Sequence, residues 1–251
     1  MSTEDGAIYD HIGAGYAVNR QPDVRWAQQI HAALAPAQTL VNVGAGSGSY
    51  EPPFMNVVAV EPAATMLRQR PADAAPAVQA VAEGLPFADG AFDVALAVLT
   101  THHWRDAALG LREMQRVARR QVVVTWEPDQ FARDFWLVRD YLPQLAVQER
   151  GLATLHAVMS GLGDVRVEPL LVPADCTDGV LGAHWRRPQE YLKAPVRASM
   201  SGLALLDQTV VGEAMARLAR DLENGAWART NAQLLGLPAA DLGYRVIVAG
   251  A

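Results

Sequence analysis

The stretch that constrains the fold most is residues 40–48, Leu-Val-Asn-Val-Gly-Ala-Gly-Ser-Gly, because an apolar, β-branched run ends there in alternating glycines. A second such run, residues 57–60, ends at the carboxylate of Glu61. The pattern predicts a strand, a tight turn and a second strand. Glycines tolerate positive φ and let a ligand approach the backbone, and a carboxylate at a strand end can accept ribose hydroxyls. We therefore predict a nucleoside-binding edge with Glu61 on the ribose. The glycines of the turn are Gly44, Gly46 and Gly48.

The spacing of these glycines disfavours a dinucleotide. It is G-x-G-x-G, whereas the dinucleotide fingerprint G-x-G-x-x-G would need glycine or alanine at Ser49. A pyrophosphate also needs a helix N-terminus directly after the turn, where this chain has Pro52 and Pro53. An NAD-dependent oxidoreductase is therefore the less favoured alternative.

Strands and helices alternate along residues 39–126, which predicts a doubly wound parallel α/β sheet. Ligands bind such sheets at the carboxyl ends of the strands. The segment between the glycine turn and the second strand has room for at most one helical turn, because Pro52 and Pro53 interrupt it. The expected strands are 40–43, 57–60, 77–82, 92–99 and 121–126, and the expected helices are 62–70 and 106–118.

Composition excludes several functional classes. The net charge is −6 and no stretch is rich in Lys or Arg, which argues against nucleic acid or an anionic membrane as partner. The single Cys176 excludes an internal disulfide and a multi-cysteine zinc site. No apolar run reaches the roughly 18 residues of a membrane span. We expect a cytoplasmic protein without a metal, and nothing in the sequence indicates its oligomeric state.

Residues 82–93 read Ala-Glu-Gly-Leu-Pro-Phe-Ala-Asp-Gly-Ala-Phe-Asp. Together with the glycine turn and Glu61, this run resembles the A-E-x-L-P-F-x-D-x-x-F-D signature of class I S-adenosylmethionine-dependent methyltransferases, in the branch related to the ubiquinone/menaquinone C-methyltransferases. The resemblance covers residues 39–127. It implies a mostly parallel, seven-stranded sheet with an antiparallel last strand, a helical cap, and S-adenosyl-L-methionine as cofactor.

The resemblance also implies a role for individual residues. The glycine turn would pass under the methionine part of the cofactor, Met66 would pack on the adenine, and the backbone of Ala82 would meet its edge. Leu99 and Thr100 would line the sulfonium. The expected cofactor-binding residues are Tyr16, Arg20, Gly44, Ala45, Gly46, Gly48, Glu61, Pro62, Met66, Ala82, Glu83, Leu99 and Thr100.

Tyr16 and Arg20 stand four residues apart, on one face of an expected N-terminal helix. From the spacing alone, a pair that holds a carboxylate and a surface arginine beside a packed tyrosine are equally good interpretations. The resemblance favours the first, since N-terminal helix residues of the family often close over the cofactor carboxylate.

The chain departs from the family pattern in three places. Asn42 stands where aspartate is more common, so a neutral amide replaces the acidic contact toward the cofactor amine. Val81 stands where aspartate or asparagine commonly bonds the adenine amino group. The helix after Gly48 is shortened, which changes the support under the turn. None of these removes the glycines or Glu61, so we expect cofactor binding to survive.

His102 and His103 follow the strand expected at residues 92–99, beside the expected methyl position. An imidazole titrates near neutrality and can act as a general base. A structural histidine, with alignment of the reactants alone sufficing, is an equally good interpretation. We favour His103 as the base.

We predict methyl transfer by in-line displacement to a small-molecule acceptor of apolar or aromatic character. An S-adenosylmethionine-binding protein without methyl transfer, acting as a regulator or a non-methylating catalyst, is the alternative. Aromatic side chains after residue 130 could form a substrate pocket, although such residues at helical spacing are more often core. These aromatic residues are Phe135, Trp136, Tyr141 and Trp185.

The expected organisation is one methyltransferase domain over residues 1–251. Within it we expect N-terminal helices over the cofactor (1–38), a cofactor-binding core (39–128), a helical insertion (129–150) and a helical cap inserted before the last strand (176–240). Further expected elements are helices 131–145 and 152–160 and strands 165–173 and 243–249.

Overall fold

The computed structural model describes residues 21–149, 152 and 154–250. Tyr16 and Arg20, and most of the expected N-terminal helices, lie outside the described residues. Within the described ranges, every helix is too short or too polar to cross a lipid bilayer.

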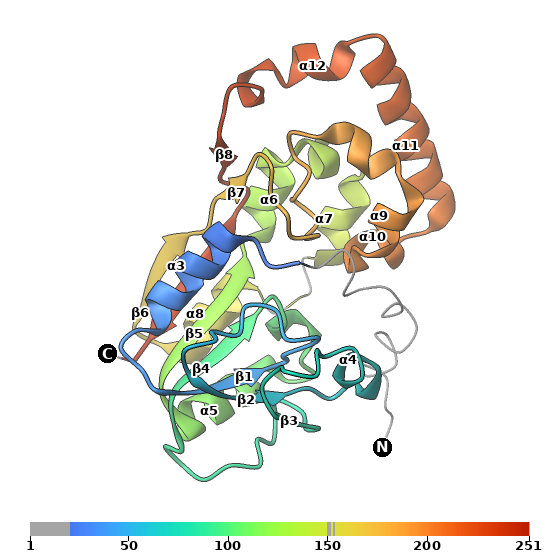
Figure 1. Cartoon of the computed structure of the whole chain (residues 1–251). Coiled ribbons are helices and arrows are strands. Elements are labelled where there is room, and N and C mark those ends of the chain that lie inside the picture. The colour runs from blue at the N-terminus through green and yellow to red at the C-terminus, as the bar shows by residue number, and fades with distance from the viewer. Residues whose placement is uncertain (1–20, 150–151, 153, 251) are drawn as a thin grey trace.

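The fold is built on a seven-stranded sheet with strand order β3-β2-β1-β4-β5-β9-β6 (Figure 1). Strands β1 to β5 run parallel, and β9 runs antiparallel to both of its neighbours, β5 and β6. This confirms the predicted fold class. The strands are β1 (Thr39–Val43), β2 (Asn56–Val60), β3 (Ala77–Val78), β4 (Phe92–Val98), β5 (Ala118–Trp126), β6 (Val165–Pro169) and β9 (Tyr244–Ala249).

Helices cover both faces of this sheet, which is why its central strands are nearly continuous apolar runs. Helix α3 (Val24–Leu34) packs Trp26 and Ile30 against one face, and Asp23 caps its N-terminus by accepting from Arg25 N–H at 2.9 Å. Helices α5 (Ala107–Val117) and α8 (Leu155–Leu162) cover the other face.

Two elements near the ligand edge are shorter than predicted. The expected helix 62–70 is the single turn α4 (Ala64–Leu67), and the expected strand 77–82 pairs with β2 only at Ala77–Val78. Beyond Leu67 the backbone continues only in tighter turns, with Gln69 N–H donating to the carbonyl of Met66 at 3.1 Å. Beyond Val78 the alternation of apolar residues misled the strand prediction, because Val81 is half exposed. The crossover between β1 and β2 contains no helix, which is within the predicted limit of at most one helical turn.

The helices after β5, apart from α8, gather at one end of the molecule, beyond the carboxyl end of β5, and we call them the cap (Figure 1). The predicted helix 131–145 is broken at Phe135 and again at Leu142. The second break precedes Pro143, which disfavours a helical conformation in the residue before it. The cap elements are α6 (Pro128–Asp134), the π-helix η2 (Leu137–Tyr141), α7 (Pro143–Glu149), η3 (Pro188–Leu192), α9 (Ala194–Ala198), α10 (Ser201–Ala204), α11 (Gln208–Glu223), α12 (Ala226–Thr230) and η4 (Ala232–Leu234).

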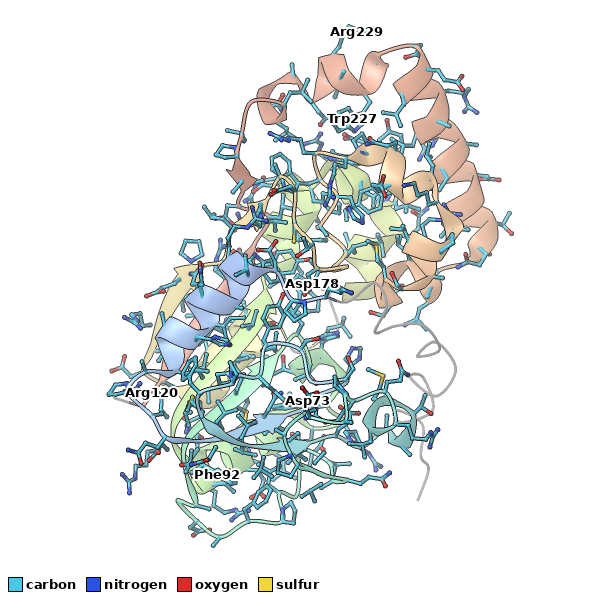
Figure 2. All side chains as sticks on the ribbon, viewed as in Figure 1. Asp73, Phe92, Arg120, Asp178, Trp227 and Arg229 are labelled. Carbon is cyan, nitrogen blue, oxygen red and sulfur yellow. The ribbon has the colours of Figure 1, made fainter. Side chains whose placement is uncertain are left out.

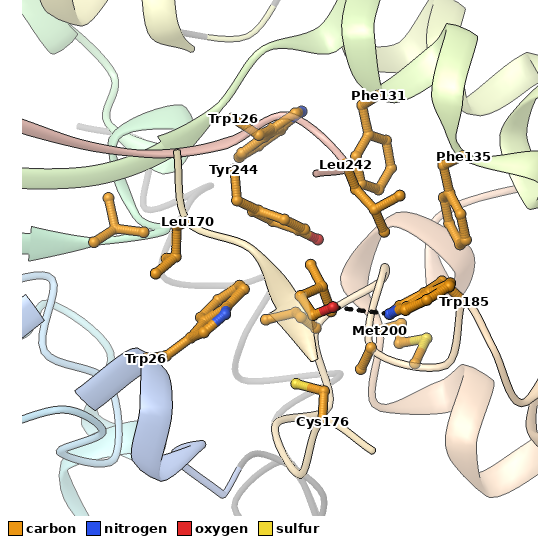
Figure 3. Close-up of a cluster of buried hydrophobic side chains, with 14 of the residues drawn as sticks. Trp26, Trp126, Phe131, Phe135, Leu170, Cys176, Trp185, Met200, Leu242 and Tyr244 are labelled. Atoms are coloured by element: carbon orange, nitrogen blue, oxygen red, sulfur yellow. Dashed lines mark hydrogen bonds between the residues drawn. The ribbon is translucent and has the colours of Figure 1, made fainter. Parts of the chain in front are cut away.

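The cap shares its hydrophobic core with the sheet. The predicted strand 165–173 divides into β6 and the short β7 (Val172–Pro173), which pairs with β8 (Ala239–Ala240). Figure 3 shows Trp26, Tyr244 and Trp185, from α3, β9 and the cap, directed into one cluster. Trp185 Nε1 donates to the carbonyl of Val172 at 3.0 Å. The aromatic residues considered for a substrate pocket are buried core, namely Phe135, Trp136, Tyr141 and Trp185.

Candidate active site

The glycine turn after β1 is held against the end of β2. The N–H groups of Gly44 and Ala45 donate to the carbonyl of Val60 at 2.8 and 3.0 Å. The φ angles of the three glycines, Gly44, Gly46 and Gly48, are +71°, +54° and +99°, a region that residues with a Cβ rarely adopt. The turn is therefore fixed in a conformation that only a glycine-rich sequence forms easily.

Gly44 also meets the end of β4. A Cβ added at Gly44 would lie 2.1 Å from Oγ1 of Thr100, which is buried. The preceding residue, Leu99, has a φ of +49°, which is unusual for leucine and stores backbone strain. The ends of β1 and β4 thus approach as closely as a glycine permits, and Thr100 lies against the glycine turn.

Glu61 lies at the end of β2, 6% exposed. Its Oε1 accepts from Ala63 N–H at 2.9 Å, and its Oε2 accepts from Gly46 N–H at 2.8 Å. Burial raises the pKa of this carboxyl, and the hydrogen bonds from Ala63 and Gly46 and the charge of Arg70 oppose the rise. Because each carboxylate oxygen has two lone pairs, Glu61 keeps acceptor capacity for hydroxyl groups.

The other expected adenosine-binding residues surround this edge. Met66 is buried, with its methyl group 3.4 Å from the position of a Cβ added at Gly46. Ala82 is buried and Pro62 is exposed. Glu83 accepts from Asp106 N–H at 3.0 Å, so its carboxylate already supports the start of α5.

The two histidines follow β4 in the one-turn helix η1 (Thr101–His103). Their ring centroids lie 3.7 Å apart. The ring centroids of His102 and Trp126, at the end of the neighbouring strand β5, lie 4.7 Å apart in an edge-to-face arrangement. The fold therefore brings both imidazoles to the same sheet edge as the glycine turn and Glu61, and it does not separate them by role.

Tyr50, which the sequence did not single out, and Asp178 tie the turn to the cap. Tyr50, with a φ of +65°, donates its hydroxyl to Oδ2 of Asp178 at 2.5 Å, and both side chains are buried. Asp178 lies where the cap meets the sheet (Figure 2). From the sequence, the polar side chains of residues 175–178 are explained by a turn as well as by a site. The partner of Asp178 is 128 residues away and leaves no local signal.

A polar cluster lies beneath the turn. Asn42 Nδ2 donates to Oε1 of Glu51 at 3.1 Å, and Nη2 of Arg70 pairs with Oε2 of Glu51 at 2.8 Å. The side chains of Arg70 and Glu51 are 5% and 9% exposed. A charged residue inside an apolar, proline-rich turn was the available signal for Glu51 in the sequence.

Among the described residues, no three His, Cys, Asp or Glu side chains gather as a metal site would require.

Comparison with known proteins identifies the family. The family described as "Methyltransferase domain" matches residues 41–124. A crystal structure from Anabaena variabilis ATCC 29413, named "putative methyltransferase from antibiotic biosynthesis pathway", is 32% identical and superposes with a TM-score of 0.85. The alignment covers 93% of this chain and 99% of that one. The chain belongs to the class I S-adenosylmethionine-dependent methyltransferases.

Two further relatives of this methyltransferase are more limited. A "SAM-dependent methyltransferase, possible histamine N-methyltransferase" from Thermotoga maritima covers 98% of this chain and 99% of its own, with a TM-score of 0.55 and 15% identity, and shows the fold alone. The uncharacterized protein YafE of Escherichia coli (strain K12) is 41% identical over 63 residues, which is 24% of this chain and 30% of that protein.

The residues of the methyltransferase fit its cofactor, S-adenosyl-L-methionine. The positive-φ glycine turn presents backbone without side chains, and Glu61 is a buried acceptor at the neighbouring strand end. Met66 adds an apolar surface at Gly46. These are the features that a nucleoside joined to an amino acid requires.

Proposed function

We propose that this methyltransferase modifies a small-molecule acceptor, with His103 or His102 as general base. The observation that carries the proposal is the placement of both imidazoles in η1, directly after Thr100, at the edge formed by the glycine turn and Glu61. When bound, S-adenosyl-L-methionine supplies an electrophilic methyl group on a sulfonium sulfur.

In this proposal the cofactor is held by the residues around the glycine turn. Glu61 accepts the ribose hydroxyls, Met66 packs on the adenine, and the backbone at Ala82 meets the adenine edge. Leu99 and Thr100 line the sulfonium, and Tyr16 and Arg20 close over the carboxylate. The strain at Leu99 and the close approach of Thr100 to Gly44 support this assignment, because strained backbone gathers at functional sites.

The chain's share of the reaction is alignment of the acceptor and removal of its proton. An in-line displacement gains most from holding the reacting atoms in line. A base within hydrogen-bond reach is needed only if the acceptor carries a proton at neutral pH. We assign removal of that proton to His103. His102, which packs on Trp126, holds the ring of His103 in place.

The acceptor class is proposed from charge and from one relative. A net charge of −6 without a basic stretch is unfavourable for nucleic acid. The Anabaena variabilis relative is named as a putative methyltransferase from an antibiotic biosynthesis pathway, which supports a small-molecule acceptor. We propose that this acceptor has apolar or aromatic character. Kinship with the ubiquinone/menaquinone C-methyltransferase branch and a cytoplasmic location belong to the same proposal.

The test uses purified enzyme, labelled S-adenosyl-L-methionine and a panel of small phenols, amines and carboxylic acids. With the acceptor that is turned over, His103→Ala should lower kcat by about 10²- to 10⁴-fold, the usual share of a general base. Cofactor affinity, measured by calorimetry, should be unchanged. His102→Ala should cost less, because its ring acts through its neighbour.

An unchanged kcat for both histidine variants would refute the base while leaving methyl transfer intact. Transfer to tRNA or protein, with every small acceptor inert, would refute the acceptor class.

A further inference from the structure

We infer that Glu51, oriented by Asn42 and Arg70, binds the α-ammonium group at the amino-acid end of S-adenosyl-L-methionine. The inference rests on the family's cofactor and not on the proposed acceptor or base. It assigns to Glu51 the negative charge that Asn42 lacks.

The crossover after β1 brings Glu51 back beside Asn42. Asn42 is the penultimate position of β1, and Glu51 follows nine residues later, within a crossover that has no helix. This irregular segment returns the Glu51 carboxylate to the end of β1, where Asn42 Nδ2 donates to it at 3.1 Å. A regular helix after Gly48 would carry residue 51 away along the helix axis. The missing helix and the neutral Asn42 are therefore linked features of one arrangement.

The neutral side chain of Asn42 lets Glu51 keep its negative charge. An aspartate at position 42 would place a second carboxylate against Glu51, and one of two adjoining carboxylates takes up a proton. With Asn42 the pair keeps a single negative charge and gains a hydrogen bond. The neutral amide at 42 and the carboxylate at 51 thus exchange roles, and one carboxylate is kept at the end of β1.

Oε1 of Glu51 has acceptor capacity for a further donor. Oε2 of Glu51 is paired with the guanidinium of Arg70 at 2.8 Å, which also donates to the carbonyl of Ala75 at 3.0 Å. Among the described residues, Oε1 receives a hydrogen bond only from the neutral Asn42 amide. A carboxylate oxygen has two lone pairs, so Oε1 can accept a second, charged donor such as an ammonium group.

Arg70 has a donor that its ion pair with Glu51 does not use. Nη1 of Arg70 is buried without a hydrogen-bond partner in the part of the chain that the structure describes, and it lies 3.2 Å from the position of a Cβ added at Gly48. Buried polar groups in proteins are almost always paired, so a 5% exposed arginine with an open donor marks an incomplete cluster. A zwitterionic amino-acid group, which carries both a cation and acceptor oxygens, has the chemistry to complete it.

The test compares two ligands that differ only at the amino-acid end. S-adenosylhomocysteine carries the ammonium and carboxylate groups, and 5′-methylthioadenosine lacks both. The electroneutral variant Glu51→Gln with Arg70→Gln avoids leaving an uncompensated buried charge. It should bind S-adenosylhomocysteine about 10- to 100-fold more weakly, as expected for loss of a charge-assisted hydrogen bond. Binding of 5′-methylthioadenosine should stay within about twofold, and thermal unfolding of the ligand-free protein should confirm that the variant folds.

A second variant, Asn42→Asp with Glu51→Gln, moves the carboxylate to β1. It should restore S-adenosylhomocysteine binding to within about threefold of the wild type, because the charge returns to the same place. Arg68→Gln is the matched control. Arg68 is exposed, lies two residues before Arg70 and donates from Nη2 to Thr65, so its replacement should change the affinity for neither ligand.

Equal weakening of both ligands would overturn the inference, since it would show that Glu51 only shapes the turn. Unchanged binding of S-adenosylhomocysteine by the first variant would overturn it as well.

Discussion

The hydroxyl of Tyr50 donates a hydrogen bond of 2.5 Å to Oδ2 of Asp178, between the turn that follows the cofactor glycines and the segment that leads from β7 to the cap helix η3. Nearby, Thr177 N–H donates to Asp23 at 3.1 Å, and Arg25 pairs with both Asp23 and Asp175. Hydrogen bonds from Arg25 hold the pKa of Asp23 well below its usual range. The start of α3, the cofactor turn and the cap are thus joined through polar side chains.

We predict that Tyr50→Phe and Asp178→Asn are coupled. A double-mutant cycle in urea should give an interaction free energy of about 1 to 3 kcal/mol, because the acceptor is a carboxylate and the pair is buried. Tyr50→Phe should also weaken S-adenosylhomocysteine binding, since it loosens the turn. The matched control is Tyr141→Phe, which removes a hydrogen bond of 2.8 Å to Asp221 within the cap and should leave that binding unchanged. Additive effects of Tyr50 and Asp178 would contradict the prediction.

Gly44→Ala should destabilise the protein by about 2 to 4 kcal/mol and abolish cofactor binding. The new Cβ would require a positive φ and would clash with Thr100 Oγ1 at 2.1 Å. Gly212→Ala is the control, because position 212 lies within α11 and has no atom within 4 Å of an added Cβ. It should stabilise the protein by about 0.5 to 1 kcal/mol. Urea unfolding and calorimetry measure both effects, and equal stabilities of the two variants would disprove the steric argument.

Glu61→Gln should weaken S-adenosylhomocysteine and 5′-methylthioadenosine alike, by about 10-fold or more, because both ligands carry the ribose. The amide of glutamine has one acceptor oxygen, so it cannot accept from both Gly46 and Ala63 N–H as the carboxylate does. Calorimetry with the two ligands separates this residue from Glu51, whose replacement should affect only the first. A selective effect at Glu61 would exclude it from the ribose.

The pH dependence of stability should contain a contribution from His184. Burial, together with the charge of Arg187, lowers the pKa of His184 to about 4. The unfolded imidazole titrates near pH 6.5, so between about pH 6.5 and 4 the unfolded chain binds a proton that the folded protein does not. Stability from this group is therefore fully present above pH 6.5 and is lost as the pH falls through that window.

His184→Gln should flatten this loss by about 1 to 3 kcal/mol between pH 7 and 4, a range that allows for the partial exposure of the ring. Urea unfolding at a series of pH values, with each protein normalised to its own stability at pH 8, makes the comparison. Parallel curves for the variant and the wild type would show that the imidazole is protonated equally in both states.

Local patterns carried much of the fold. The strands at Leu40 and Val57 and the helix-free crossover at Pro52 could be predicted because alternation, β-branching and proline act over a few residues. The break before Pro143 and the short pairing at Ala77 and Val78 could not be predicted in length, because helix and strand ends depend on what packs beside them.

The sequence by itself determined the family's sheet edge, since glycines at positions 44, 46 and 48 and a carboxylate at 61 act within one local unit. Only the tertiary structure decided that Tyr50 meets Asp178 and that Glu51 stands beside Asn42. The physical reason is that such contacts join side chains from separate segments, and no periodicity encodes which segments will meet. The charge missing at Asn42 was visible in the sequence, and the carboxylate beside it became visible only when the chain was folded.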